Sequence, residues 1–177
     1  MMRGIFSFIL VFYTLVVFGQ KSGIPASIAV PEGSKLIAHT YAKGVQVYVC
    51  TQNLKDSSRY AWTFKEPRAK LYADSKYHKL VGKHYFDAGK NPTWETTDGS
   101  KVSGIKVQQA NSPDSTAIPW LLLQSTATQR SGRFTHVLFI QRIDTKGGKA
   151  PAIADKANKG QSAEVAYTAE YLFYGEK

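Results

Sequence analysis

A two-residue alternation of apolar side chains constrains the fold of this chain more than any other feature. In "EVAYTAEYLFY" the residues Val165, Tyr167, Ala169, Tyr171 and Phe173 occupy every second position, and "VQVYVCT" and "YAWTF" repeat the pattern. Because successive side chains of a strand point to opposite faces, this period predicts strands, and no segment shows a sustained helical stripe. The predicted fold is all-β, an antiparallel β-sandwich or flattened barrel with little helix after the N-terminal segment.

Two continuous apolar runs and two interruptions refine this prediction. "HVLFI" and "WLLL" are typical of strands that are covered on both faces. Gly104 interrupts a strand in which the apolar positions change phase between Val102 and Ile105, and this predicts a β-bulge. The segment "PAIADKANKGQS" is predicted to be a loop with at most one short helical turn.

The first twenty residues predict a secretory signal peptide. Arg3 precedes an apolar run from Ile5 to Phe18, and small Gly19 follows. The run is shorter than the roughly 20 residues of a membrane-spanning helix. We therefore expect residues 1–19 to be removed, 20–34 to be an extended leader and 35–177 to be a single β domain. The mature protein would be exported to the periplasm or the medium, with no transmembrane helix.

The net charge points to anionic partners. Twenty-three Lys and Arg against 13 Asp and Glu give +10, and loss of Arg3 would leave +9. An anionic glycan or another component of the cell envelope fits such a charge. Nucleic acid is disfavoured, because the lysines are spread along the chain without an Arg-rich arm or a nucleic-acid motif. No feature indicates an oligomeric state.

The cysteine and histidine content predicts neither a disulfide nor a metal site. Cys50 is the only cysteine, and its place in "VQVYVCT" predicts a small buried hydrophobe rather than a reactive thiol. The four histidines, His39, His78, His84 and His136, form none of the close pairs from which metal sites are inferred. We expect no metal and no cofactor.

Nucleotide-binding and nucleophile motifs are absent as well. The chain has no G-x-S-x-G elbow, P-loop or G-x-G-x-x-G motif, and no helix start follows "GGKAP" at once. No residue is assigned a catalytic role. The candidates for ligand binding are aromatic, cationic or acidic residues near predicted strand ends: His84, Lys90, Trp94, Glu95, Trp120 and Arg142.

Trp94 is the leading aromatic candidate, because a loop precedes it and the hairpin signal Asp98-Gly99 follows it. An exposed Trp94 could stack on a sugar ring or another flat group while His84 or Lys90 contacts its polar part. A core tryptophan beneath the turn is the alternative, and Trp120 fits a core position better still. If this segment is a strand, Glu95 faces away from Trp94 and toward water. Arg142 either reaches a ligand or satisfies loop carbonyls.

Three functions remain open from the residues alone. The first is a non-catalytic binding or envelope-associated module for a glycan or other polyanion. The alternative is a hydrolase that acts on a cell-wall or extracellular polymer, with His84, Glu95, Asp98 and Arg142 as its site groups. A third, weaker hypothesis is a metal or redox protein that uses histidines with Cys50.

An ordered series of motifs resembles the uncharacterised domain-of-unknown-function 3455 family. The motifs are "VPEGSKLIAHTYAKGVQVYVC", "WTFKEPRAKLYA", "VGKHY", "PTWETTDGSKVSG", "AIPWLLLQ", "IQRIDTKGGKAP" and "VAYTAEYLFY", and they span about Val30 to Tyr174. The resemblance implies an exported protein but no established activity. Some fungal members are labelled malate dehydrogenase, a label that this chain does not support because it lacks every feature of a nicotinamide-binding domain.

The chain departs from the family pattern at two places. Many members have a second cysteine shortly after the "GGKAP" motif, where this chain has Ala154 and Asp155, so a disulfide from the position of Cys50 would be absent here. The loop would then be more mobile. The segment "FDAGKN" separates the His-Tyr and Pro-Thr-Trp-Glu motifs, which are nearly adjacent in many members, and this weakens the expectation of a shared site of His84 and Trp94.

Overall fold

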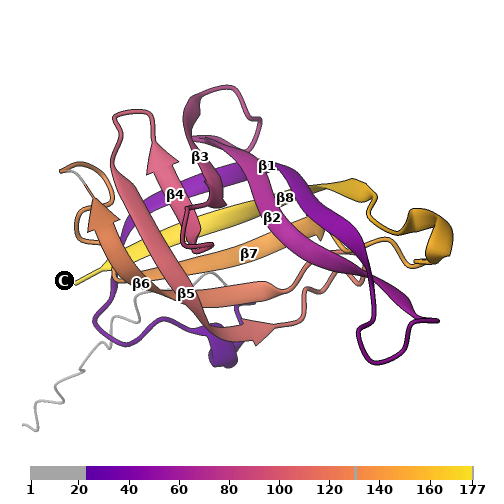
Figure 1. Cartoon of the computed structure of the whole chain (residues 1–177). Coiled ribbons are helices and arrows are strands. Elements are labelled where there is room, and N and C mark those ends of the chain that lie inside the picture. Colours follow the sequence, from indigo (N-terminus) through magenta and orange to yellow (C-terminus); the bar gives the residue numbers. More distant parts are fainter. Residues whose placement is uncertain (1–22, 130, 177) are drawn as a thin grey trace, which may run out of the picture.

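Eight antiparallel strands, joined in sequence order, form the fold (Figure 1). The computed structural model describes residues 23–129 and 131–176. The strands are β1 (Lys35–Gln52), β2 (Tyr60–Tyr72), β3 (Leu80–Phe86), β4 (Pro92–Thr96), β5 (Lys101–Ala110), β6 (Trp120–Gln129), β7 (Phe139–Gly147) and β8 (Ser162–Gly175). Within these residues the helical elements are two 3-10 turns, η1 (Ala26–Ile28) and η2 (Lys156–Asn158). The predicted all-β class is confirmed, and so is the short turn in the loop before β8.

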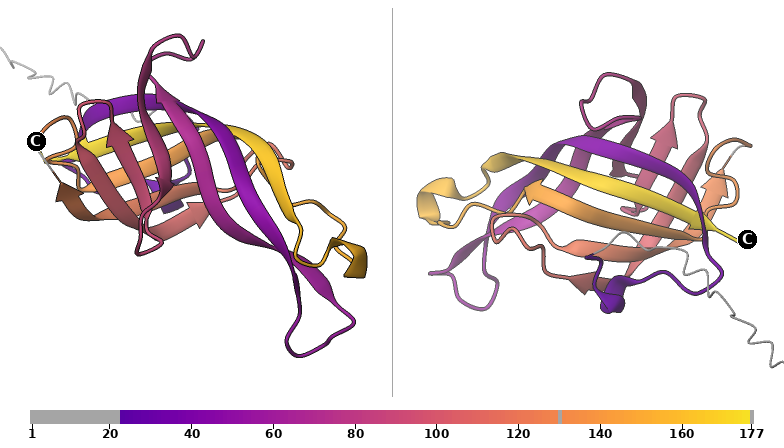
Figure 2. Two further views of the ribbon diagram at one scale, coloured as in Figure 1. Left: turned by 45° about the horizontal axis from the view of Figure 1, so that its top comes forward. Right: turned by 180° about the vertical axis from the view of Figure 1, so that it is seen from behind.

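The sheet closes into a barrel, because β1 pairs with both β2 and β8. The pairing of β1 with β8 runs from Lys35 opposite Gly175 to Val49 opposite Ser162. Both views in Figure 2 show the indigo β1 beside the yellow β8. A closed barrel leaves no unpaired edge strand. Of the two predicted architectures, the barrel is the one that forms.

The main core fills the barrel interior. The alternate residues Tyr167, Ala169, Tyr171 and Phe173 of β8 are all buried, which confirms that they share a face. On β1 the three valines of "VQVYVC" share the outer face, and Gln46, Tyr48 and Cys50 occupy the inner one. The alternation thus identified which residues lie together, but within this segment the inner face of β1 is the more polar of the two.

Gly44 lets β1 and β2 approach closely. A Cβ atom at this position would lie 2.1 Å from the carbonyl oxygen of Arg68 and 2.4 Å from the Cα atom of Ala69. Real side chains do not reach such distances, so only glycine fits without a shift of the backbone.

A second, smaller core lies outside the barrel, beneath the leader. Ile28 of η1 is fully buried, and it belongs to an apolar cluster with Trp120, Leu122, Ile143 and Leu172. The side-chain amide of Gln141 also donates a hydrogen bond of 2.7 Å to the carbonyl oxygen of Ile28. The described part of the leader therefore covers the outer face of β6, β7 and β8. "WLLL" is buried on both faces as predicted, because Leu123 belongs to the inner core.

The predicted bulge and hairpin are both present. The β5–β6 register shifts between Ser103 and Gly104, which confirms the bulge. In the β4–β5 hairpin Gly99 has a φ of +86°, whereas Asp98 does not adopt a positive φ. Asp98 acts through its side chain instead, since its carboxylate accepts hydrogen bonds from the Ser100 backbone amide at 3.0 Å and from the Thr96 hydroxyl.

The prediction of a strand over "HVLFI" is only partly right. β7 begins at Phe139, and the residues before it form a turn in which the Val137 amide donates to the Phe134 carbonyl oxygen at 3.2 Å. Val137 and Phe134 are 1% and 0% exposed. Within the run Val137 and Ile140 belong to the barrel core and Phe139 packs against the second cluster, whereas Leu138 is exposed. Burial of Val137 does not require a strand backbone.

In the described part of the chain, no helix is long and apolar enough to cross a membrane. The predicted signal peptide and its cleavage site lie outside the described residues. Cys50 is 1% exposed and unpaired, which confirms its predicted burial. Its Sγ atom lies 3.9 Å from the carbonyl oxygen of Asp155, so the loop in which the family resemblance implies a second cysteine does contact Cys50.

Candidate functional site

The candidate site is a pocket of about 260 Å³ that reaches into the barrel. Its lining includes Phe86 and Pro92, which flank the β3–β4 loop, and Ile118 and Pro119, which end the β5–β6 loop. Apolar side chains line most of it, together with the rings of Tyr48, Trp94 and Tyr171. The polar lining consists of Gln46, His84, Lys106, Gln109 and Arg142. A largely apolar pocket with a few convergent polar groups is the usual form of a small-molecule site.

His84 and Trp94 form the stacked centre of this pocket. They are paired across β3 and β4, so both side chains project to the same face of the sheet. Their ring centroids are 4.5 Å apart with an interplanar angle of 10°. The ring of Tyr171 completes the group, at 5.1 Å from His84 and 5.2 Å from Trp94.

His84 is held as a neutral imidazole. Its Nδ1 atom lies 2.9 Å from the carbonyl oxygen of Thr93. A carbonyl oxygen only accepts, so Nδ1 carries the proton and Nε2 is left as an acceptor. Burial lowers the pKa of His84 from 6.5 to about 3; the hydrogen bond to Thr93 opposes this shift, and the charge of Arg142 adds to it.

Arg142 brings a positive charge to the same place. It lies on β7, and its Nε and Nη2 atoms donate hydrogen bonds of 3.1 and 2.8 Å to the carbonyl oxygen of Pro119. No ion pair joins Arg142 to any described residue, and no Asp or Glu is found among the described residues that line the pocket. The guanidinium therefore has spare N–H donors and no neighbouring anion.

Several buried polar atoms of the barrel interior have no hydrogen bond of good geometry. They are the hydroxyl oxygens of Tyr167 and Tyr171 and the side-chain nitrogens of Gln46 and Trp94, although Tyr171 interacts with Arg142 and Tyr167, and Tyr167 interacts with Gln46. Burial raises the pKa of both tyrosines, and the charge of Arg142 opposes this in both. Buried polar groups are nearly always paired, so such a cluster marks a place where a polar ligand group would be stabilised.

Three of the six candidate residues meet in this pocket: His84, Trp94 and Arg142. Trp94 is 1% exposed, so the alternative of a buried tryptophan is right and the exposed one is wrong. The alternation of the strand places Trp94 on the inner face, where β8 and β3 cover it.

The other three candidates lie elsewhere. Glu95 is on the outer face of β4, where it contacts Lys83 at 3.3 Å and Lys101 at 3.5 Å and accepts a hydrogen bond from Tyr85. Lys90 is exposed in the β3–β4 loop and does not line the pocket. Trp120 faces outward beneath the leader.

The side chains predicted to form a hydrolase site lie in different parts of the barrel. His84 points into the barrel, and its sequence neighbour Lys83 and its cross-strand neighbour Glu95 point out of it. The carboxylate of Asp98 is engaged in the β4–β5 turn. The four groups proposed for hydrolysis are therefore not brought together.

The sequence analysis did not name five of the pocket's polar and tyrosine residues as candidates: Gln46, Tyr48, Lys106, Gln109 and Tyr171. Tyr171 was assigned only to a strand face. The signal for Gln46 was present, since it alternates with the valines of β1 and shares a face with Tyr48. A polar residue on the aromatic side of an alternating strand is the pattern that would have identified it.

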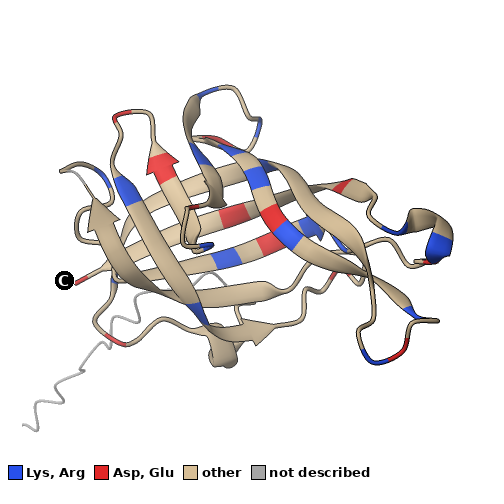
Figure 3. Cartoon of the chain, in the orientation of Figure 1, with Lys and Arg blue, Asp and Glu red and all other residues tan. Residues whose placement is uncertain are grey.

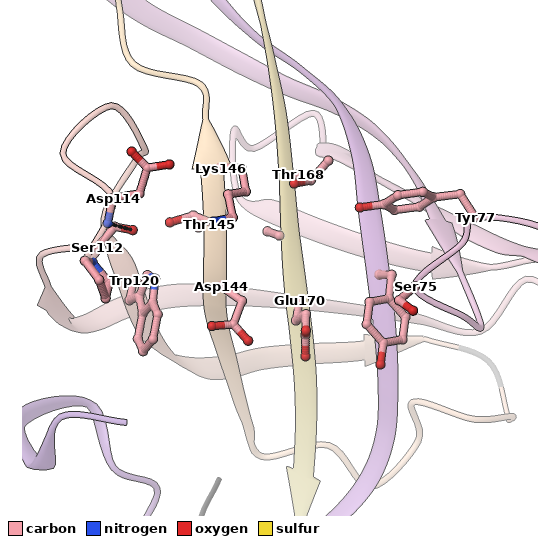
Figure 4. A pocket seen from close by; sticks show the side chains of 13 residues that line it. Ser75, Tyr77, Ser112, Asp114, Trp120, Asp144, Thr145, Lys146, Thr168 and Glu170 are labelled. Atoms are coloured by element: carbon pink, nitrogen blue, oxygen red, sulfur yellow. Dashed lines mark hydrogen bonds between the residues drawn. The ribbon is translucent and has the colours of Figure 1, made fainter. Parts of the chain in front are cut away.

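A separate groove of about 480 Å³ crosses the outer face of β7, β8 and β1 (Figure 4). Asp144 and Glu170 lie on it, with Asp114 from the β5–β6 loop and Tyr77 from the β2–β3 loop. Glu170 is 2.8 Å from the Nε2 atom of His39. The described residues contain no cluster of three or more His, Cys, Asp or Glu side chains that could hold a metal ion.

Comparison with known proteins identifies the family but no function. No curated protein and no solved structure matches the chain. The family model described as "Protein of unknown function (DUF3455)" matches residues 31–175, which include every strand of the barrel. The chain therefore belongs to the DUF3455 family.

Proposed function

We propose that this protein is a non-catalytic binding module whose barrel pocket holds a small organic anion. The observation that carries the proposal is the Arg142 guanidinium, which faces a pocket with no carboxylate among its described lining residues. A partly buried cation is stabilised strongly by an anion that pairs with it through charge-assisted hydrogen bonds. Only two N–H groups of Arg142, at Nε and Nη2, donate hydrogen bonds to the carbonyl oxygen of Pro119.

The surroundings of Arg142 favour a carboxylate or a similar oxyanion. The hydroxyl of Tyr171, which has no hydrogen bond of good geometry, supplies a further buried polar group beside Arg142, and Lys106 adds a second cation to the pocket lining. The neutral His84 adds no charge to the pocket, and its Nε2 atom can only accept a hydrogen bond. An oxyanion accepts several hydrogen bonds at once, whereas a neutral ligand would leave the guanidinium without a counter-charge.

The size of the pocket limits the rest of the ligand. A cavity of roughly 150 Å³ accommodates benzene, so a pocket of about 260 Å³ has room for one ring or a short chain besides the anionic group. The apolar wall, with the side chains of Phe64, Phe86 and Leu123, favours an apolar body. An aromatic or short aliphatic acid fits this description, and so does one terminal acidic unit of a glycan.

We also propose that the protein binds its ligand outside the cytoplasm. The predicted signal peptide supports this part of the proposal, since its Arg3, apolar run and Gly19 have the organisation of a cleaved leader.

A paired set of ligands tests the function. Benzoate, hexanoate and glucuronate are compared with benzyl alcohol, hexanol and glucose by calorimetry and by tryptophan fluorescence, because Trp94 lines the pocket. The anions should bind and their neutral counterparts should not. Arg142→Gln should weaken binding about tenfold or more, whereas the control Arg59→Gln, which removes a charge in the exposed β1–β2 loop, should not.

Three results would overturn the proposal. They are equal binding of neutral and anionic ligands, unchanged affinity in a folded Arg142→Gln variant, and no binding by any of the three anions.

A further inference from the structure

A row of charged side chains crosses the outer surface of the barrel at one register. Lys43 of β1 is paired with Lys70 of β2, and Lys70 is paired with Lys83 of β3. The row continues through Glu95 of β4 to Lys101 of β5. Figure 3 shows the corresponding blue and red bands on neighbouring strands. All five side chains point outward, because their sequence neighbours on each strand fill the interior.

The first three members of this lysine row are cations directly opposite one another. Neighbouring strands lie about 4.8 Å apart, and like charges directly opposite on a sheet are destabilising. Glu95 contacts Lys83 at 3.3 Å and Lys101 at 3.5 Å. Lys43 and Lys70 form no ion pair with any described residue, although the ammonium group of Lys43 lies 5.3 Å from the ring centroid of Tyr77.

The same face is neutralised close to the lysine row. Arg68 lies two residues from Lys70 on β2, and it contacts Glu66 at 3.5 Å and Glu164 at 2.6 Å. Among the described residues of this face, the cations of the row without an ion pair are therefore Lys43 and Lys70, since Glu95 contacts Lys83 and Lys101. On the β8 side the row ends at Thr168, opposite Lys43, where the groove with Asp144 and Glu170 begins.

We propose that the lysine row binds a linear anionic polysaccharide that lies across the strands. Its cations follow one another in single file at the strand spacing, which is close to the length of one sugar unit in an extended chain, so successive uronate or sulfate groups can each meet one ammonium. An anion between Lys43, Lys70 and Lys83 would remove the repulsion among them. The proposal goes beyond the pocket function, because the row and Arg142 lie on opposite faces of the barrel wall.

A single-stranded nucleic acid fits the row less well. Such proteins stack bases on open aromatic rings, but the rings of Tyr77 and Tyr85 have lysine ammonium groups over them, at 5.3 and 5.1 Å. The row therefore offers charge without a stacking surface.

Two triple variants with the same loss of charge test the proposal. One carries Lys43→Gln, Lys70→Gln and Lys83→Gln. The control carries Lys55→Gln, Lys65→Gln and Lys156→Gln, at exposed positions outside the row. Binding of fluorescent polygalacturonate is measured by anisotropy at 50 and 200 mM salt, with neutral dextran and oligo(dT) as comparison polymers.

The row variant should bind polygalacturonate about tenfold or more weakly than the native protein, and its salt dependence should be shallower, because three fewer ammonium groups release counterions from the polymer. The control variant should stay within about twofold. Thermal denaturation should show that the row variant is no less stable than the native protein, since repulsion has been removed.

Equal weakening by the two triples would overturn the proposal in favour of net charge, and so would failure of the native protein to bind polygalacturonate. Tighter binding of oligo(dT) would favour nucleic acid instead. The row variant should bind benzoate and hexanoate as tightly as the native protein does, because none of its three lysines lines the pocket, so this result and that of the pocket experiment can be told apart.

Discussion

The neutral state of His84 should make the stability of the fold depend on pH. The pKa of His84 is 6.5 in an unfolded chain and about 3 in the barrel. Between these values the unfolded state binds more protons than the folded state, so the free energy of unfolding falls as the pH is lowered. The contribution is fully present above about pH 6.5 and is lost as the pH falls toward 3.

The magnitude follows from the same two values. At about 1.4 kcal/mol for each pH unit, the gap between 6.5 and about 3 gives an upper bound of about 5 kcal/mol. Between pH 7 and pH 5 the linkage relation gives about 2 kcal/mol. Carboxylates with lowered pKa values, such as Asp98, lose their contribution mainly at lower pH, where their own protonation begins.

Urea unfolding at pH 7 and pH 5 measures this loss. The native protein should lose about 2 kcal/mol more than His84→Asn, a variant that keeps an N–H donor for Thr93 but cannot titrate. His78→Asn, in the exposed β2–β3 loop, is the matched control and should behave as the native protein does. An equal loss in His84→Asn and the native protein would refute the buried neutral state, as would an NMR titration midpoint of His84 above pH 5.

Four further predictions concern other parts of the chain. Trp94→Ala should lower the free energy of unfolding by about 3–5 kcal/mol, because a fully buried ring is removed; a loss below 1 kcal/mol by urea titration would contradict this burial. Gly44→Ala should abolish cooperative unfolding or lower the melting temperature strongly, because its Cβ would lie 2.1 Å from the Arg68 carbonyl oxygen; a native-like melting curve would count against the close approach of β1 and β2. Cys50 should react with a bulky thiol reagent only in denaturant, and rapid labelling of the native protein would show that it is accessible. Expressed in a secreting host, the exported protein should begin at Gln20 by N-terminal mass spectrometry, and recovery of intact Met1 would disprove the predicted cleavage.

The strands could be predicted from the sequence because their signal is local. The alternation within "VAYTAEYLFY" and the change of phase around Gly104 depend only on neighbouring residues, so a strand or a bulge can be predicted from each short segment by itself. Closure of the sheet depends instead on the pairing of Lys35 with Gly175, and no local pattern encodes a partner that far along the chain. For this reason the sandwich and the barrel stayed open as alternatives until the strand order was known.

The candidate site, too, could be predicted from the sequence only in part. His84, Trp94 and Arg142 could be chosen by their chemistry, but their convergence depends on the β3–β4 register and on the position of β7. The alternation of the strand was enough to predict that Glu95 and Trp94 lie on opposite faces. The burial of Trp120 was predicted and is confirmed, but its place in the outer cluster could not be predicted, because its cover comes from Ile28 in a leader that has no strand pattern.

The pairing of the first strand with the last determines when the barrel can be completed. Lys35 and Gly175 are 140 positions apart in the chain. Strand β1 therefore has only one of its two neighbours until β8 has been synthesised and has paired with it. A nascent or truncated chain exposes the backbone groups of both β1 and β7, and exposed strand edges pair with other chains. Closure must also overcome the entropy of a very long loop, which makes it a slow step. A chain that lacks a few residues of the C-terminal strand should therefore aggregate, rather than fold into a smaller stable domain.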